Sequence, residues 1–146
     1  MKTVMVFGTF DGVHPGHEYF LAEARKFGER LVVCIARDSI VYELKGQPPK
    51  RPEIERREAL AEDRHVDQVV YGDRELGSYR IVEEIAPDVI ALGYDQVELK
   101  QSLANWISSR GLSIELTDIA SHRPDLYKSS LMNLPAAGNR PGRKSA

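Results

Sequence analysis

The sequence predicts an α/β protein in which a doubly wound parallel sheet carries helices on both faces. One observation is a set of apolar, β-branched runs that are nearly continuous rather than alternating, which is typical of strands buried on both faces. The other is that segments with helical periodicity separate these runs, so strands and helices alternate along the chain. Parallel strands then require right-handed crossovers. The strands are expected at residues 3–8, 30–36, 66–72, 88–93 and 112–119.

Helices are expected between these strands, each with a residue that marks where it begins or ends. The first, in PGHEYFLAEARKFG, is expected to stop at Gly28, since glycine readily ends helices. The second follows Pro52, because proline suits the start of a helix. The third, SYRIVEEIA, ends before Pro87, and the fourth, VELKQSLANWISSR, stops at Gly111. These signals complete an alternating β–α pattern.

Composition predicts an ordinary globular domain that works on small molecules. The chain has 146 residues, 42% of them hydrophobic, and a net charge of −2, so neither nucleic acid nor a membrane is expected as a partner. No segment is long and apolar enough to cross a bilayer, and the apolar stretch near residue 1 is too short for a signal peptide. The single Cys34 lies in an apolar run and predicts a packed thiol. A cytoplasmic location is therefore expected.

Two segments depart from the alternating pattern. Residues 43–57 are rich in proline and in basic side chains, which fits a site that gathers several negative charges. Residues 135–146 are small, polar and rich in Pro and Gly, which predicts a disordered tail after a single domain at 1–134. The cations of the first segment are Lys45, Lys50, Arg51, Arg56 and Arg57, of which Lys50, Arg51 and Arg57 are expected to form an ordinary solvated face.

The ten residues GTFDGVHPGH, at 8–17, stand where the first strand passes into the first helix. Ligands of open α/β sheets bind beyond the carboxyl ends of the strands, and this segment occupies such a place. Gly8 provides a tight turn, and Pro15 suits the first turn of a helix. His14 and His17 are then three residues apart on one helical face.

This segment predicts a cradle for an anion. A helix N-terminus offers unpaired N–H groups and a partial positive charge, and Gly16 leaves room for a phosphate between the histidines. The Walker loop and the dinucleotide fingerprint are both absent. His-x-x-His lacks the further ligands of a zinc site. Asp11 could bind a metal ion or serve as an ordinary turn residue.

The pattern G-T-F-D-x-x-H-x-G-H, as it stands in Gly8 to His17, resembles the signature of the cytidylyltransferase-like nucleotidyltransferases. The resemblance implies a Rossmann-like sheet of five parallel strands in the order 3-2-1-4-5. It also implies nucleotidyl transfer from a nucleoside triphosphate to a phosphate group, with release of pyrophosphate. Within that superfamily the chain looks most like the archaeal-type FAD synthetases, which transfer AMP from ATP to FMN. The residues behind this likeness are ARD (36–38), LKG (44–46), ERRE (55–58), PDVIALGYDQ (87–96) and the pair Ser129–Ser130.

The resemblance also implies roles for the residues around the phosphates. His14 and His17 would hydrogen-bond the α- and β-phosphate oxygens, and the N–H groups of Thr9 and Phe10 would line the same cradle. Lys45 would contact the acceptor or the α-phosphate, with Arg56 on the acceptor side.

Two later segments are implied to hold the rest of the nucleotide. Gly93 gives room to the base or ribose and Asp95 accepts its hydrogen bonds, while Ser129 and Ser130 bind the β- and γ-phosphates. Mg²⁺ is expected with ATP, because triphosphate sites usually need a cation to offset their charge. Dimers are common in this superfamily, so a homodimer is a further expectation.

Other functions remain open at this point. The same fold could transfer CMP to glycerol 3-phosphate or AMP to phosphopantetheine. A nucleotide-binding sensor without turnover is an alternative from another class. The intact H-P-G-H, Lys45 and Arg56 favour an enzyme over that sensor.

Overall fold

The computed structural model describes residues 1–12 and 14–120. The expected tail at 135–146 and the pair Ser129 and Ser130 lie outside these described residues, and so does the end of the expected domain at 134.

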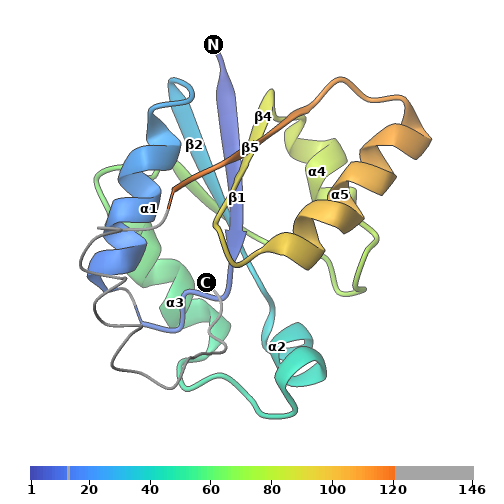
Figure 1. The fold of residues 1–146 in the computed structure, drawn as a ribbon. Helices are drawn as coiled ribbons and strands as arrows, with labels where there is room; N and C mark the ends of the chain where they lie inside the picture. The colour runs from blue at the N-terminus through green and yellow to red at the C-terminus, as the bar shows by residue number, and fades with distance from the viewer. Residues whose placement is uncertain (13, 121–146) are drawn as a thin grey trace, which may run out of the picture.

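The strands form one parallel sheet in the order β3-β2-β1-β4-β5, which confirms the predicted fold class and order (Figure 1). Every strand lies inside a predicted run, with the ends trimmed by a few residues. Their bounds are β1 (Thr3–Gly8), β2 (Arg30–Ile35), β3 (Gln68–Tyr71), β4 (Val89–Leu92) and β5 (Glu115–Asp118).

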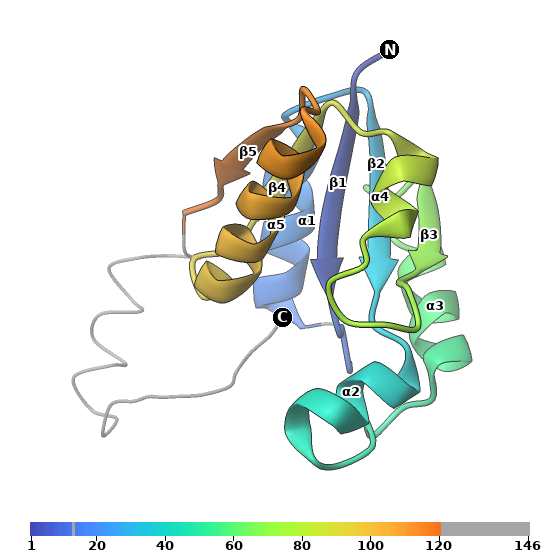
Figure 2. The same ribbon diagram turned by 90° about the vertical axis from the view of Figure 1, so that its right-hand side faces the viewer.

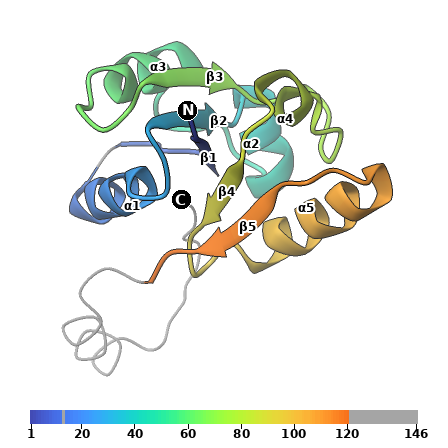
Figure 3. The ribbon, with the colours of Figure 1, turned by 90° about the horizontal axis from the view of Figure 1, so that it is seen from above.

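Helices cover both faces of the sheet (Figure 3). The helices α1 and α3 pack on one face, and α4 and α5 pack on the other. The short helix α2 lies beyond the carboxyl ends of β1 and β2 (Figure 2). The bounds are α1 (Pro15–Arg25), α2 (Asp38–Lys45), α3 (Glu53–Ala61), α4 (Arg80–Ile85) and α5 (Val97–Arg110).

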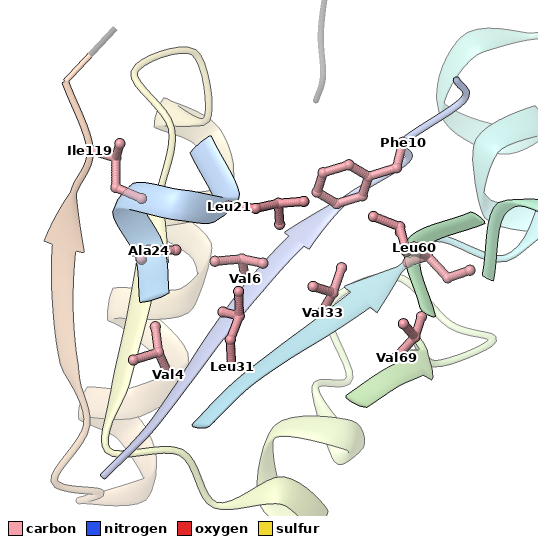
Figure 4. Close-up of a cluster of buried hydrophobic side chains, with 12 residues drawn as sticks. Val4, Val6, Phe10, Leu21, Ala24, Leu31, Val33, Leu60, Val69 and Ile119 are labelled. Atoms are coloured by element: carbon pink, nitrogen blue, oxygen red, sulfur yellow. The ribbon is translucent and has the colours of Figure 1, made fainter. Parts of the chain in front are cut away.

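Alternate residues of β1 point to opposite faces of the sheet, and each face is covered by its own hydrophobic cluster. This explains why the sequence of β1 is mostly apolar. Val4 and Val6 belong to the cluster that includes Leu21 and Ala24 of α1 (Figure 4). Met5 lies on the other face, in the cluster with α4 and α5. In the part of the chain that the structure describes, no helix is long and apolar enough to cross a lipid bilayer.

Two local expectations were wrong. Helix α1 ends at Arg25, before Gly28, and Gly28 is needed for another reason: a Cβ there would lie 2.6 Å from the carbonyl oxygen of Lys2. Helix α2 was not expected at all, since only Ile40 and Val41 of its eight residues are buried. Gly111, with φ of 65°, does end α5 as predicted.

Candidate active site at the carboxyl end of the sheet

The site lies where β1 and β4 separate at the centre of the sheet. Six residue pairs align between β1 and β2, but only Val4 with Val89 and Met5 with Ile90 align between β1 and β4. The order of strands reverses here, which is the usual place for a ligand in an open α/β sheet. One face of this opening is the segment GTFDGVHPGH, and the other is the loop after β4.

The Gln96 side chain bridges this opening. Its Nε2 donates to the carbonyl oxygen of Phe7 at 2.9 Å, and its Oε1 accepts from the backbone N–H of Gly93, also at 2.9 Å. The amide thus holds the ends of β1 and β4 at a fixed spacing. The sequence analysis missed this residue, although it stands next to Asp95 in the LGYDQ segment.

His14 caps the first turn of α1 through its own ring. The Gly16 N–H donates to His14 Nδ1 at 3.1 Å, so the neutral ring carries its proton on Nε2. Nε2 is therefore left as a donor for a ligand. A Cβ on Gly16 would lie 2.9 Å from Cε1 of His14, so the glycine makes room for this ring as well as for an incoming phosphate.

His17 lies one turn further along α1 and stacks on His14, with ring centroids 3.8 Å apart and an interplanar angle of 26°. The buried Phe10 ring meets it edge-on at 5.1 Å. Phe10 itself has a φ of 52°, a strained conformation of the kind that functional sites often contain. His17 Nδ1 is buried without a hydrogen-bond partner among the described residues, so it is available to a ligand. The predicted pairing of the two imidazoles is confirmed.

The environment keeps His17 neutral at neutral pH. Its pKa is lowered to about 4, chiefly by burial and next by the charge of a protonated His14, while a hydrogen bond with the Gly12 backbone acts in the opposite direction. A bound triphosphate would favour the protonated ring instead, because an opposite charge stabilises an imidazolium.

This low pKa predicts a loss of stability in weak acid. The unfolded chain takes up the proton near pH 6.5, whereas folded His17 resists it down to about pH 4. His17 therefore contributes its full stability above pH 6.5, and this is lost as the pH falls toward 4. Relative to a His17→Asn variant, the free energy of unfolding should fall by about 2 kcal/mol between pH 7.5 and 4.5. Urea titrations of both proteins measure this, and parallel pH profiles would contradict it.

Arg56 is wholly buried and hydrogen-bonded within the chain. Its Nη1 donates to the carbonyl oxygens of Thr9 at 2.9 Å and Ala36 at 2.8 Å, and its Nε donates to that of Arg51 at 2.9 Å. Nη2 pairs with the Asp38 carboxylate at 2.7 Å. Arg56 thus holds the segments around the cradle together, and its predicted contact with the acceptor stays a prediction.

Asp11 joins the cradle to the basic segment. Its carboxylate accepts the backbone N–H groups of Lys50 at 2.7 Å and Arg51 at 2.9 Å, one on each oxygen. The structure therefore gives this residue a bridging role. A metal ion at Asp11 stays a prediction.

The remaining predicted residues lie around the same end of the sheet. Thr9 directly follows Gly8, the last residue of β1, and Lys45 is exposed at the last position of α2. A Cβ on Gly93 would lie 3.2 Å from Asp95 Oδ1 and 3.5 Å from the Phe20 ring. Gly93 is therefore where α1 and the loop after β4 approach most closely. The nucleoside role of Gly93 and Asp95 stays a prediction.

A cavity of about 550 Å³ opens beside Gly8 and Thr9. Its walls come from β1, the end of β2 with α2, the segment between β3 and α4, and the start of α5. Among the described residues no Lys or Arg lines it, whereas four carboxylates do, those of Asp73, Glu75, Asp95 and Glu98. Three apolar side chains at its rim are largely exposed: Leu44 (62%), Leu76 (50%) and Val97 (70%). Such a pocket suits a large uncharged ring better than a small polar molecule. It was not foreseen, because its walls come from four separate segments.

Cys34 lines this cavity and is 2% exposed, which confirms the packed thiol. Burial raises its pKa to about 12, with help from the charge of Asp73 and against that of Arg37. The group remains a thiol at neutral pH and is not a nucleophile.

One group of three potential metal ligands occurs among residues 1–12 and 14–120, made up of Glu18, Asp63 and His65. Asp63 Oδ1 already accepts the backbone N–H of His65 and contacts its ring at 3.1 Å. None of the three lies in the GTFDGVHPGH segment, and none lines the cavity.

Comparison with known proteins agrees with this geometry. The family described as cytidylyltransferase-like matches residues 5–133. The chain belongs to the cytidylyltransferase-like family. Similar proteins named FAD synthase include one from Ferroglobus placidus, 43% identical over 120 residues that cover 82% of this chain and 76% of that protein. Another, from Methanothermobacter thermautotrophicus, is 44% identical and covers 84% of this chain and 82% of that protein.

Solved structures of this cytidylyltransferase-like fold are also similar. A structure titled lipopolysaccharide core biosynthesis protein, from Thermoplasma volcanium, has a TM-score of 0.76 and 34% identity, covering 84% of this chain and 98% of that one. Pantothenate synthetase from Thermus thermophilus has a TM-score of 0.61 and 15% identity, covering 84% of this chain and 57% of that one. The second likeness concerns the fold alone.

Proposed function

We propose that this chain transfers AMP from ATP to FMN, giving FAD and pyrophosphate. The relatives named FAD synthase support this acceptor. For each of the two described above, the match extends over more than three quarters of the relative's length. The observation that carries the proposal is the apolar cavity next to the histidine pair.

The cavity favours FMN over the other acceptors considered. The flavin ring system is large, planar and uncharged, and burying it against Ile40, Leu76 and Leu99 is favourable. Glycerol 3-phosphate is small and polar and would leave such a pocket largely unfilled. The cavity also reaches Thr9, so a phosphate attached to the ring through a flexible chain would arrive at the cradle.

In the proposed reaction an oxygen of the FMN phosphate attacks the α-phosphorus of ATP in line, and pyrophosphate leaves. No bond to the protein is formed, so catalysis comes from positioning and charge stabilisation. His14 donates from Nε2 to a phosphate oxygen, and His17 adds a second ring nitrogen as charge develops. Lys45 supplies a mobile positive charge from the end of α2.

Mg²⁺ is expected to reach this site with the nucleotide. Magnesium commonly binds through substrate phosphates with only one or two protein carboxylates, and it would offset the charge of the triphosphate. Asp11 is the carboxylate within the GTFDGVHPGH segment, and both of its oxygens already accept backbone N–H groups. Phosphate oxygens therefore supply most of the ligands. The buried, unpaired Cys34 is in keeping with a reducing cytoplasm, where we place the reaction.

The test is to incubate the protein with ATP, FMN and Mg²⁺ and to measure FAD and pyrophosphate together. Equal amounts of both products are expected. Parallel reactions contain CTP with glycerol 3-phosphate and ATP with phosphopantetheine. Pyrophosphate release with either of these pairs but not with FMN would overturn the proposed acceptor, and release with no pair would favour a binding module.

A further inference from the structure

Arg51 is held rigidly at the edge of the cradle by its backbone. Its N–H donates to Asp11 Oδ1 at 2.9 Å, and its carbonyl oxygen accepts from Arg56 Nε at 2.9 Å. One anchor belongs to the GTFDGVHPGH segment and the other is the buried arginine that also binds the Thr9 carbonyl. The backbone position of Arg51 is therefore fixed relative to the phosphate-binding loop, even though it lies in a proline-rich connection.

The Arg51 guanidinium lies over Gly12, in the loop that leads to the histidines. A Cβ on Gly12 would lie 3.6 Å from Arg51 Nε and 3.8 Å from Nη2. Gly12 has a φ of 100°, so a side chain there would be strained, and its Cβ would be in ordinary van der Waals contact with the guanidinium. The glycine permits the turn of the loop, and the cation lies beside that turn.

In the described part of the chain, no carboxylate forms an ion pair with the Arg51 guanidinium. Arg25, Arg37, Arg56 and Arg110 each face a carboxylate within 4.0 Å, whereas Arg51 has no such partner among the described residues. Its side chain is exposed. An anchored arginine with a free planar fork beside an anion cradle is well suited to bind phosphate oxygens in a bidentate manner.

The position of the acceptor cavity indicates which phosphates Arg51 meets. In-line transfer places the attacking and leaving oxygens on opposite sides of the α-phosphorus. The cavity reaches the loop at Gly8 and Thr9, and neither Gly12 nor Arg51 lines it. Resting on the proposed function, we propose that Arg51 binds the β- and γ-phosphates of ATP, and so the pyrophosphate that leaves.

The test measures binding of inorganic pyrophosphate and of FMN by calorimetry, each in the presence of Mg²⁺. Arg51→Ala should weaken pyrophosphate binding by about 10- to 100-fold, because it removes charged hydrogen bonds, and should raise KM for ATP. FMN affinity and the melting temperature should not change. Arg51→Lys should recover only part of the loss.

Lys50→Ala is the matched control, since the Lys50 N–H is anchored on the same Asp11 carboxylate while its side chain is not placed over Gly12. It should leave pyrophosphate affinity within about twofold of the original. Unchanged pyrophosphate affinity in Arg51→Ala, or an equal loss in Lys50→Ala, would overturn the inference, as would a selective loss of FMN affinity. Pyrophosphate binding that depends on Arg51 without FAD formation would instead leave this site in place and refute the proposed acceptor.

Discussion

His17→Ala should lower kcat by about 10²- to 10⁴-fold, because it removes a group that stabilises charge on the transferring phosphate. The buried Nδ1 has no hydrogen-bond partner among the described residues, so no hydrogen bond of this atom is lost on substitution. The ring also fixes His14 by stacking at 3.8 Å, and part of the loss comes through that neighbour. Single-turnover measurement of FAD formation with saturating ATP isolates the effect on the chemical step.

The control for this substitution is His65→Ala. His65 hydrogen-bonds Asp63 and lies outside both the cradle and the cavity, so turnover should be unaffected. Near-normal single-turnover rates in His17→Ala would remove His17 from the mechanism. Melting temperatures at pH 7.5 for both variants show whether any loss of rate arises from unfolding.

Arg56→Met should lower the free energy of unfolding by about 3–5 kcal/mol, the range found when one partner of a buried charged network is removed. Methionine fills much of the space but leaves the carbonyl oxygens of Thr9, Ala36 and Arg51 without their donor. Turnover should fall as well, because these carbonyls belong to segments that surround the phosphates. Urea denaturation and steady-state kinetics measure the two effects separately.

Arg57→Met is the matched control on the same helix. Its guanidinium lies over the Tyr71 ring, with Cζ 5.9 Å from the ring centroid, and such contacts contribute about 1 kcal/mol or less at exposed sites. Equal free energies of unfolding for Arg56→Met and Arg57→Met would contradict the structural role assigned to Arg56. Arg56→Lys should resemble Arg56→Met, because one ammonium group cannot reach four acceptors.

The parts of the fold that the sequence predicted are those set by burial on both faces. The strands β1, β2 and β4 are mostly apolar because helices cover both sides of the sheet, and this leaves a clear signal. Helix α2 left no such signal, since only Ile40 and Val41 of its eight residues are buried. Gly28 was misinterpreted because its requirement comes from the backbone of Lys2, which is distant in sequence.

The same distinction applies to the site. His14 and His17 were predictable because their pairing needs only one turn of helix. The hydrogen bond from Gln96 to Phe7 joins residues 89 positions apart, and no local sequence pattern in either segment predicts it. Arg51 and Arg56 belong to one basic segment, and their sequence does not distinguish them. Only the structure shows that the Arg51 guanidinium lies over Gly12 and that the Arg56 side chain is buried.

The contacts of Arg56 with Thr9, 47 positions away, and of Asp11 with Lys50, 39 positions away, make the phosphate loop dependent on distant parts of the chain. A synthetic peptide spanning 8–17 would lack both supports and should have no measurable affinity for nucleotide. Anyone grafting this segment into another scaffold would have to transplant the anchoring arginine and its carbonyl acceptors with it. The loop and its anchors therefore extend from β1 through α3, well beyond the ten residues that identify it.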